Sequence, residues 1–310
     1  MTNIRSAIFF LLFTILISFQ LYSQSTSDYV ETKKTDNMLK ILTWNIYMLP
    51  HCSWLKGNCK RAAEIAKKLK STDYDIIVFE EAFDFRARGI LRKQLKAEFP
   101  FMYGPANLSV FSLRTSSGIW VMSKIPLKKI HEIEYKNRYG IDAMARKGAV
   151  MFEGEWKGRD FQLVGTHLQA DSPDDVRREQ CKEISHTLLQ KYSRNNVPQF
   201  VCGDFNIEMK DSANYQFMLK TLDVQNGEMD GDIHTSFDEI DNTLAQKPNG
   251  KKWLIDYILV RNSQLIQNIR RKVSIFQGLN QNTTIDLSDH YAIEAIIDFG
   301  ENFEYTAAIK

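Results

Sequence analysis

The 310-residue sequence predicts a layered α/β sandwich, in which helices cover the faces of β-sheets. Short apolar runs recur along the chain. They are rich in β-branched and aromatic residues and are bounded by turn residues, as is typical of strands. Segments with apolar residues at helical spacing lie between these runs. Because groups of strands alternate with helices, we expect sheets with helices packed against them.

Two segments are predicted as helices because each carries an apolar stripe along one face. The segment 61–69 has Ala62, Ile65 and Leu69 on one face, and the segment 174–192 has a comparable stripe. Eight apolar runs are too short for ordinary helices and are predicted as strands. They are 40–44, 76–79, 118–122, 149–152, 161–165, 199–202, 253–260 and 292–297.

Residues 1–24 are predicted to be a cleaved signal peptide, so we expect a secreted protein. Arg5 precedes an apolar run, 7–18, which is shorter than the roughly 20 residues needed to cross a bilayer. This length disfavours the alternative, an uncleaved anchor. No linker or fixed-period repeat divides the remainder. The expected organisation is a polar lead-in at 25–38, one folded domain at 39–300 and a C-terminal tail at 301–310.

The charge balance disfavours nucleic acid as a partner. The formal net charge is +2, and it falls to +1 without residues 1–24, in which Arg5 is the one charged residue. Binding to a phosphate backbone rests on many Lys and Arg contacts, which a near-neutral chain does not offer.

Four cysteines in an exported chain permit disulfides. Cys52 and Cys59 lie close together ahead of a predicted helix, and we expect them to be bridged. Cys181 and Cys202 occupy apolar positions of a helix and a strand, which favours small buried side chains.

Asp204 and Asn206 follow the predicted strand 199–202 and are two residues apart. In an extended chain such residues face the same side, so a carboxylate and an amide oxygen point together. This pair suits a hard cation or a phosphate-bound water. On its own, the sequence Gly-Asp-Phe-Asn is also an ordinary turn.

Asp256 interrupts the apolar run 253–260 near its middle, so its carboxylate needs a partner. We expect that partner to be His290, because a buried Asp that fixes the tautomer of an imidazole makes the histidine a directed general base. The alternative is that backbone amides hold Asp256 for structural reasons alone.

His167 ends the predicted strand 161–165, where a single histidine is more often a surface residue. Taken together with the other polar residues at strand ends, it completes a set of oxygen and imidazole groups suited to a metal and a phosphate. The other members are Asn45, Glu81, Asp204, Asn206, Asp256 and His290.

Six motifs, in order, resemble the endonuclease/exonuclease/phosphatase superfamily: 42–45, 80–81, 165–167, 203–206, 255–258 and 288–290. Within it, the chain is similar to the neutral sphingomyelinases of bacteria through 45–50, 165–170, 178–184 and 248–251. The resemblance covers 39–299. It implies that 39–300 is a catalytic domain with a four-layered α/β/β/α sandwich of two packed mixed sheets flanked by helices.

The resemblance also implies a role for each matching residue. Glu81 is expected to be the main Mg²⁺ ligand, with Asn45 and Asp289 beside the metal. His290, oriented by Asp256, is expected to act as the general base. Asp204 and Asn206 position water and phosphate, His167 donates to a phosphoryl oxygen, and Lys147, paired with Asp142, lies near the phosphate. One or more Mg²⁺ ions are expected, with Mn²⁺ or Co²⁺ as substitutes.

One position departs from the family pattern, because Glu80 stands where Gln or Asn is usual before the metal-binding Glu. Strand alternation predicts that Glu80 points away from Glu81 and is tolerated.

The implied activity is hydrolysis of sphingomyelin to ceramide and phosphocholine. The expected partner is a membrane surface that contains sphingomyelin, with no nucleic acid and no protein partner. The alternatives are a secreted nuclease or other phosphoesterase of the same fold, and a catalytically silent membrane-binding protein. The last is disfavoured because no catalytic position is missing.

Membrane docking is expected to be weak. Haemolytic relatives insert an aromatic-tipped hairpin before the final motif, whereas the interval 261–287 offers only Ile275, Phe276 and Leu279 here. The alternative is that docking occurs elsewhere, through Trp54 and Leu55 or through the loop 108–111.

Overall fold

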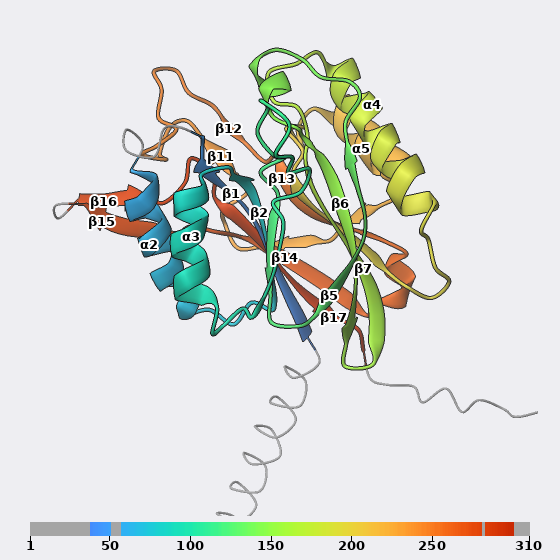
Figure 1. Cartoon of the computed structure of the whole chain (residues 1–310). Helices are drawn as coiled ribbons and strands as arrows, with labels where there is room; N and C mark the ends of the chain where they lie inside the picture. Colours follow the sequence, from blue (N-terminus) through green and yellow to red (C-terminus); the bar gives the residue numbers. More distant parts are fainter. Residues whose placement is uncertain (1–37, 51–56, 281–282, 301–310) are drawn as a thin grey trace, which may run out of the picture. The chain divides into compact units, whose positions relative to one another are not determined.

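The computed structural model describes residues 38–50, 57–280 and 283–300. Within it, Leu39–Phe299 forms one compact unit with two large sheets and the helices that cover them (Figure 1). The predicted signal peptide, most of the polar lead-in and the C-terminal tail lie outside the described residues.

The first large sheet has seven strands in the order β10-β14-β17-β1-β2-β4-β3. β1 and β2 are parallel, whereas β2 and β4 are antiparallel, so the sheet is mixed. The bounds are β1 (Met38–Met48), β2 (Ile76–Ala82), β3 (Phe101–Tyr103), β4 (Trp120–Ser123), β10 (Glu228–Asp230), β14 (Asn268–Ser274) and β17 (Ala292–Asp298).

The second large sheet has six strands in the order β5-β6-β7-β8-β13-β9. β7 and β8 are parallel and the other pairs are antiparallel, so this sheet is mixed as well. The bounds are β5 (Leu127–Glu134), β6 (Gly148–Trp156), β7 (Arg159–His167), β8 (Gln199–Asp204), β9 (Gln225–Asn226) and β13 (Asp256–Arg261).

Alternation along β1 and β2 places successive apolar side chains in two different cores. Ile41 and Val78 belong to the core that both sheets share, whereas Leu42 and Phe79 pack under α2 (Asn58–Lys70) and α3 (Phe85–Leu95). On the other side, α4 (Asp174–Ile184) and α5 (Ser212–Leu222) cover the second sheet (Figure 1). The predicted four-layered α/β/β/α sandwich is therefore confirmed.

The prediction of one continuous strand over 253–260 is wrong, because this segment contains parts of two separate strands. β12 (Lys252–Trp253) pairs with β11 (Phe237–Asp238), and β13 begins only at Asp256. The amides of Ile255 and Asp256 donate to the Ser236 hydroxyl, at 3.0 and 3.2 Å. The break places Asp256 at the start of a strand and not in the middle of one.

The remaining elements are short. The predicted helix 174–192 is α4 followed by a π-helical turn, Ser185–Gln190. β15 (Gln277–Asn280) and β16 (Thr283–Asp286) form a hairpin, and 3₁₀ turns occupy Ile141–Met144 and Ser263–Leu265. No helix in the described part of the chain is long and apolar enough to cross a membrane.

The disulfide prediction is not supported. Cys59 lies in the first turn of α2 with a free thiol, and Cys52 falls outside the described residues. Closeness in sequence does not set the narrow geometry that an S–S bond requires. Cys181 and Cys202 are buried free thiols, as predicted from their apolar positions.

Candidate active site

Strand pairing gathers the polar residues at one place between the two sheets. Asn45 of β1 lies opposite Glu80 of β2, and His167 of β7 lies opposite Asp204 of β8; both pairs of strands are parallel. Asp256 of β13 lies opposite Asp204 on its other side. Because parallel strands end at the same sheet edge, residues distant in sequence meet there.

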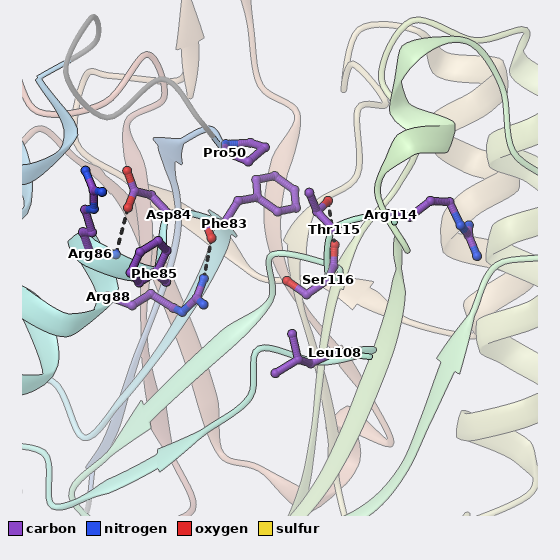
Figure 2. Close-up of a pocket in the computed structure, with 10 residues that line it drawn as sticks. All are labelled: Pro50, Phe83, Asp84, Phe85, Arg86, Arg88, Leu108, Arg114, Thr115 and Ser116. Atoms are coloured by element: carbon purple, nitrogen blue, oxygen red, sulfur yellow. Dashed lines mark hydrogen bonds between the residues drawn. The ribbon is translucent and has the colours of Figure 1, made fainter. Parts of the chain in front are cut away.

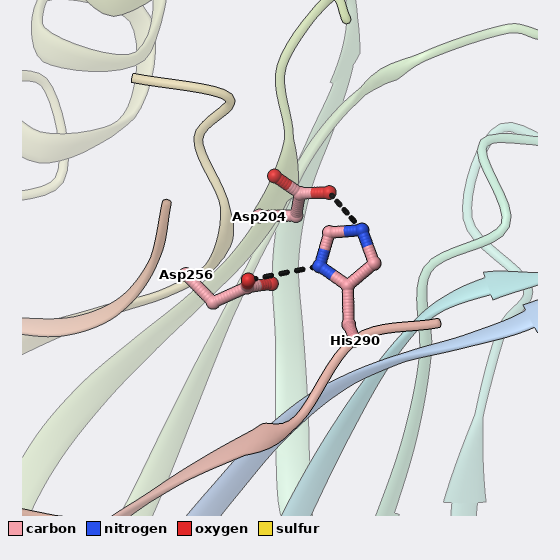
Figure 3. A group of neighbouring side chains, drawn as sticks. All are labelled: Asp204, Asp256 and His290. Carbon is pink, nitrogen blue, oxygen red and sulfur yellow. Dashed lines mark hydrogen bonds and ion pairs between the residues drawn. The ribbon is translucent and has the colours of Figure 1, made fainter. Parts of the chain in front are cut away.

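Asp256 and His290 are hydrogen-bonded, with 2.9 Å between Asp256 Oδ2 and His290 Nδ1 (Figure 3). Both side chains are buried. The structure thus brings together the two residues that the sequence analysis paired. Burial alone would lower the pKa of His290, but the carboxylates of Asp256 and Asp204 outweigh burial and raise this pKa well above its usual range.

Asp204 lies between the two histidines. Its Oδ2 accepts a hydrogen bond from Asn45 Nδ2 at 3.1 Å and lies 3.4 Å from His167 Nε2 and 3.8 Å from His290 Nε2. Its Oδ1 accepts from the backbone amide of Asn206 at 2.9 Å. These contacts fix the carboxylate from both sides and hold it within reach of a group bound between the histidines.

Asp204, Asp256 and His290 together have ligand atoms within 4.8 Å of one another, a spacing that also suits a metal ion (Figure 3). However, the Nδ1 atom of His290 is already bonded to Asp256. Mg²⁺ also prefers oxygen ligands to imidazole. The arrangement therefore fits proton transfer better than it fits Mg²⁺ coordination.

Lys147 and His167 form a second buried pair. The Lys147 ammonium lies 3.0 Å from His167 Nε2 and donates to Asp142 Oδ2 at 2.6 Å and to the Leu168 carbonyl at 3.0 Å. Burial and the charge of Lys147 lower the pKa of His167 to about 3, so this imidazole is neutral. An ammonium only donates, so Nε2 is the acceptor and Nδ1 carries the ring proton.

The carboxylate of Glu81 fits a divalent cation. Glu81 has a left-handed backbone, φ 52°, and its Oε2 is buried without a hydrogen-bond partner among the described atoms. Burial raises the pKa of Glu81 to about 7, and the like charge of Asp289 adds to this. Burial also raises the pKa of Asp289. Two half-buried carboxylates that repel each other, one with a buried and unpartnered oxygen, are a donor set for an oxygen-seeking cation.

Strand alternation holds at Glu80, and the face it selects is the one that also carries the catalytic carboxylates Asp256 and Asp204. Glu80 continues the face of Val78, toward the core between the sheets, and its Oε1 accepts from Thr43 Oγ1 at 2.7 Å. Burial raises the pKa of Glu80 well above its usual range, and the charge of Asp256 adds to this. The left-handed backbone of Glu81 breaks the alternation, so both neighbours influence the site.

Arg61 is a residue near the site that no sequence motif marks. Its buried guanidinium donates to the carbonyls of Ile46, at 2.9 Å, and Leu287, at 2.8 Å. It therefore joins β1 to the segment that leads into Asp289, and its charge favours the ionised form of Asp289. In the sequence, Arg61 is only the first residue of a predicted helix, and its partner Leu287 is 226 positions away.

Ser236 and Phe237 are two further neighbours of the Asp256–His290 pair that the sequence does not reveal. The Ser236 hydroxyl holds the backbone where β13 begins, and the ring of Phe237 lies 4.8 Å from the ring of His290. No motif marks either residue, because Ser236 lies in a loop and Phe237 in the two-residue strand β11.

The protein has a recess of about 410 Å³ (Figure 2). It begins two residues after Glu81 in the sequence, and none of the expected catalytic residues lines it. Its walls are Pro50, Phe83, Asp84, Phe85, Arg86, Arg88, Leu108, Arg114, Thr115 and Ser116.

The hairpin of β15 and β16 offers little apolar surface. Phe276, just before it, stacks on Trp44 with 4.8 Å between ring centroids, whereas Leu279 is exposed. The tip, residues 281–282, lies outside the described part of the chain.

Residues 42–290 match the Endonuclease/Exonuclease/phosphatase family, and the chain belongs to that family. It is 28% identical over 297 residues to a phospholipase C of Staphylococcus aureus, covering 86% of this chain and 89% of the relative. It is 26% identical over 315 residues to a sphingomyelinase C of Bacillus cereus, covering 89% and 94%. Among solved structures, an S. aureus beta toxin variant with bound magnesium ions has a TM-score of 0.73 and 27% identity, covering 83% of this chain and 98% of that one.

Proposed function

We propose that this protein is a secreted, Mg²⁺-dependent phosphodiesterase that hydrolyses sphingomyelin to ceramide and phosphocholine. The observation that carries the proposal is the buried hydrogen bond between Asp256 and His290. It lies beside Asp204, and His290 interacts electrostatically with Glu81. A carboxylate-oriented imidazole next to a cation-binding carboxylate is the arrangement that metal-assisted attack by water requires.

His290 is the general base of this proposal. Asp256 holds the Nδ1 proton, so Nε2 is the nitrogen left to accept a proton from water. The surrounding carboxylates favour the imidazolium, which cannot accept that proton. Glu81 and Asp289 would hold a cation whose charge would oppose the imidazolium and lower the pKa of His290 toward the working pH.

Glu81, Asp289 and Asn45 would hold the Mg²⁺ ion, with Mn²⁺ or Co²⁺ as substitutes. When bound, such an ion stabilises the negative charge that develops on phosphoryl and leaving oxygens. The free Oε2 of Glu81 and the repulsion between Glu81 and Asp289 support this assignment.

Lys147, His167, Asn45 and Asn206 would hold the phosphate. Lys147 is only 4% exposed, and a buried ammonium compensates the charge of a phosphodiester more effectively than a solvated one. The resemblance implies that His167 donates to a phosphoryl oxygen, and the ring proton of the neutral imidazole is on Nδ1. Asp204 would position the attacking water between the two histidines.

The substrate class is supported by similarity over most of the chain to relatives named sphingomyelinase C and phospholipase C. The near-neutral net charge of +2 weakens the alternative, a nuclease of the same fold. Export is supported by the pattern of residues 1–24, and the expected partner is a membrane surface that contains sphingomyelin.

One assay separates these activities. Purified protein is incubated with sphingomyelin, phosphatidylcholine or plasmid DNA, each with Mg²⁺ or with a chelator. We expect phosphocholine release from sphingomyelin that the chelator abolishes. Cleavage of DNA without lipid hydrolysis would support the nuclease instead. Binding to vesicles without hydrolysis of any substrate would support a silent membrane-binding protein.

A further inference from the structure

The four large apolar side chains with the highest exposed fractions in the described chain lie on two loops. They are Leu113 (103%), Phe111 (98%), Ile141 (91%) and Val110 (88%). Leu108 and Met144, on the same loops, are also exposed. Exposed apolar residues scattered singly are normal, but a cluster of this kind marks an interaction surface. We call these six side chains the apolar platform.

The two loops form one structural unit. The amide of Thr115 donates to the Met144 carbonyl at 3.1 Å, and the amide of Arg146 donates to the Thr115 carbonyl at 3.1 Å. The Asn107 side chain also donates to the Arg146 carbonyl, at 2.9 Å. These bonds hold residues 107–116 against residues 139–146, so the platform is presented on a fixed backbone.

The same unit reaches the candidate active site. Asp142 follows exposed Ile141, and its Oδ2 accepts from Lys147 Nζ at 2.6 Å. Lys147 in turn lies 3.0 Å from His167. On its other side the platform borders the recess that begins two residues after Glu81, where Leu108 and exposed Phe85 are both lining residues (Figure 2). The apolar surface therefore adjoins the groups assigned to the phosphate and the cation.

The charges of the platform suit a surface of lipid phosphates. Residues 107–116 contain Arg114, which is paired with Glu134 outside the loop, and no carboxylate. Residues 139–146 contain one carboxylate, Asp142, which Lys147 neutralises. The guanidinium of Arg86 lies 5.6 Å from the ring of exposed Phe85 at the far wall of the recess. Apolar tips flanked by cations are the composition that inserts into the boundary between headgroups and acyl chains.

We propose that the apolar platform is the membrane-docking surface of this protein and that it inserts into choline-lipid bilayers beside the active site. The inference rests on the proposed function, since a lipid substrate has to be drawn from a bilayer into the site. It places docking on residues 107–116 and 139–146, and not on the β15–β16 hairpin.

The test compares vesicle binding by the chain without residues 1–24 and by two matched variants. Vesicles contain sphingomyelin and phosphatidylcholine, and a chelator prevents hydrolysis. The double variant Val110→Ser with Phe111→Ser is expected to lower the bound fraction at least about tenfold. The control Leu279→Ser, which removes the 74% exposed side chain of the hairpin, is expected to bind like the parent chain. Both variants should hydrolyse a water-soluble choline phosphodiester within about twofold of the parent rate.

A third variant keeps the inference testable if the double variant does not fold. Phe111→Trp is expected to show a blue shift of tryptophan emission when vesicles are added, relative to the parent chain. Equal vesicle binding by the parent and the double variant, or no blue shift, would overturn the inference. The inference would also be overturned if the parent chain formed a dimer, the double variant were a monomer, and both bound vesicles equally. The platform would then face a second copy of the chain. If the double variant loses vesicle binding and the parent chain hydrolyses no substrate, the result would support docking by the platform and would contradict only the proposed function.

Discussion

The Nδ1 atom of His290 lies 2.9 Å from the Oδ2 atom of Asp256, and the two residues come from segments 34 positions apart. Asp256 is the first residue of β13, and His290 lies two residues before β17 begins. One segment from each of the two large sheets therefore fixes the orientation of the imidazole. This relationship gives the first prediction.

Asp256→Asn is expected to lower kcat at least about hundredfold, because the amide no longer holds His290 in the tautomer with a free Nε2. The carboxylate of Asp256 raises the pKa of His290, so its removal should also lower that pKa. The acidic limb of the kcat/KM profile should move to lower pH. An unchanged profile with full activity would show that Asp256 does not orient the base.

Glu81→Gln and Glu80→Gln form a matched pair of neighbouring substitutions. Glu81→Gln is expected to weaken Mg²⁺ binding and lower turnover at least about hundredfold, because it removes a charged ligand. Glu80→Gln is expected to be mild, since burial raises the pKa of Glu80 and so favours its neutral form, and a glutamine oxygen can accept from Thr43. Isothermal titration with Mg²⁺ and turnover assays check both. The reverse ranking would show that Glu80 is the ligand.

Mg²⁺ affinity is expected to depend on pH near neutrality. The pKa of Glu81 is raised to about 7, so this carboxyl is mostly protonated below that pH and mostly ionised above it. Only the ionised form binds the cation strongly, so affinity should fall as pH decreases through about 7. Titrations at about pH 6, 7 and 8 measure this. Affinity that is constant over the range would argue against Glu81 as the main ligand.

Arg61→Met is expected to lower the free energy of unfolding by about 2–4 kcal/mol, because the buried carbonyls of Ile46 and Leu287 lose their donor. The control is Arg86→Met, because the Arg86 side chain is exposed. This substitution should change the free energy of unfolding by no more than about 0.5 kcal/mol. Chemical denaturation compares the two. Equal effects would mean that Arg61 does not join β1 to the segment before Asp289.

The strands that the sequence predicted correctly are those with continuous apolar runs, such as β2 and β8, because burial on both faces leaves a strong signal. β5 was missed, since the sequence Leu-Lys-Lys-Ile-His-Glu-Ile-Glu is mostly polar and buries only its first residue fully. α3 was missed as well, because Ala87, Leu91 and Leu95 supply only one buried residue per turn. The side chain of Asp84 caps that helix, and a single cap is a weak signal in a sequence.

The site was predictable where function depends on residues at strand ends, since such residues interrupt apolar runs. Asp256 and Asp204 were found in this way. Arg61 and Phe237 were not, because their roles depend on contacts with distant segments, which a local pattern does not contain. The tautomer of His167 likewise follows from the position of Lys147 and not from any motif.

The most direct test of the central claim is phosphocholine release from sphingomyelin vesicles by the parent chain and by His290→Ala, with Mg²⁺ and with a chelator. A general base typically contributes about a hundredfold or more to turnover. We predict rapid release by the parent chain with Mg²⁺, release at least about a hundredfold slower by His290→Ala, and none above background in chelator. Near-parental release by His290→Ala, or release by the parent chain that persists in chelator, would contradict the account.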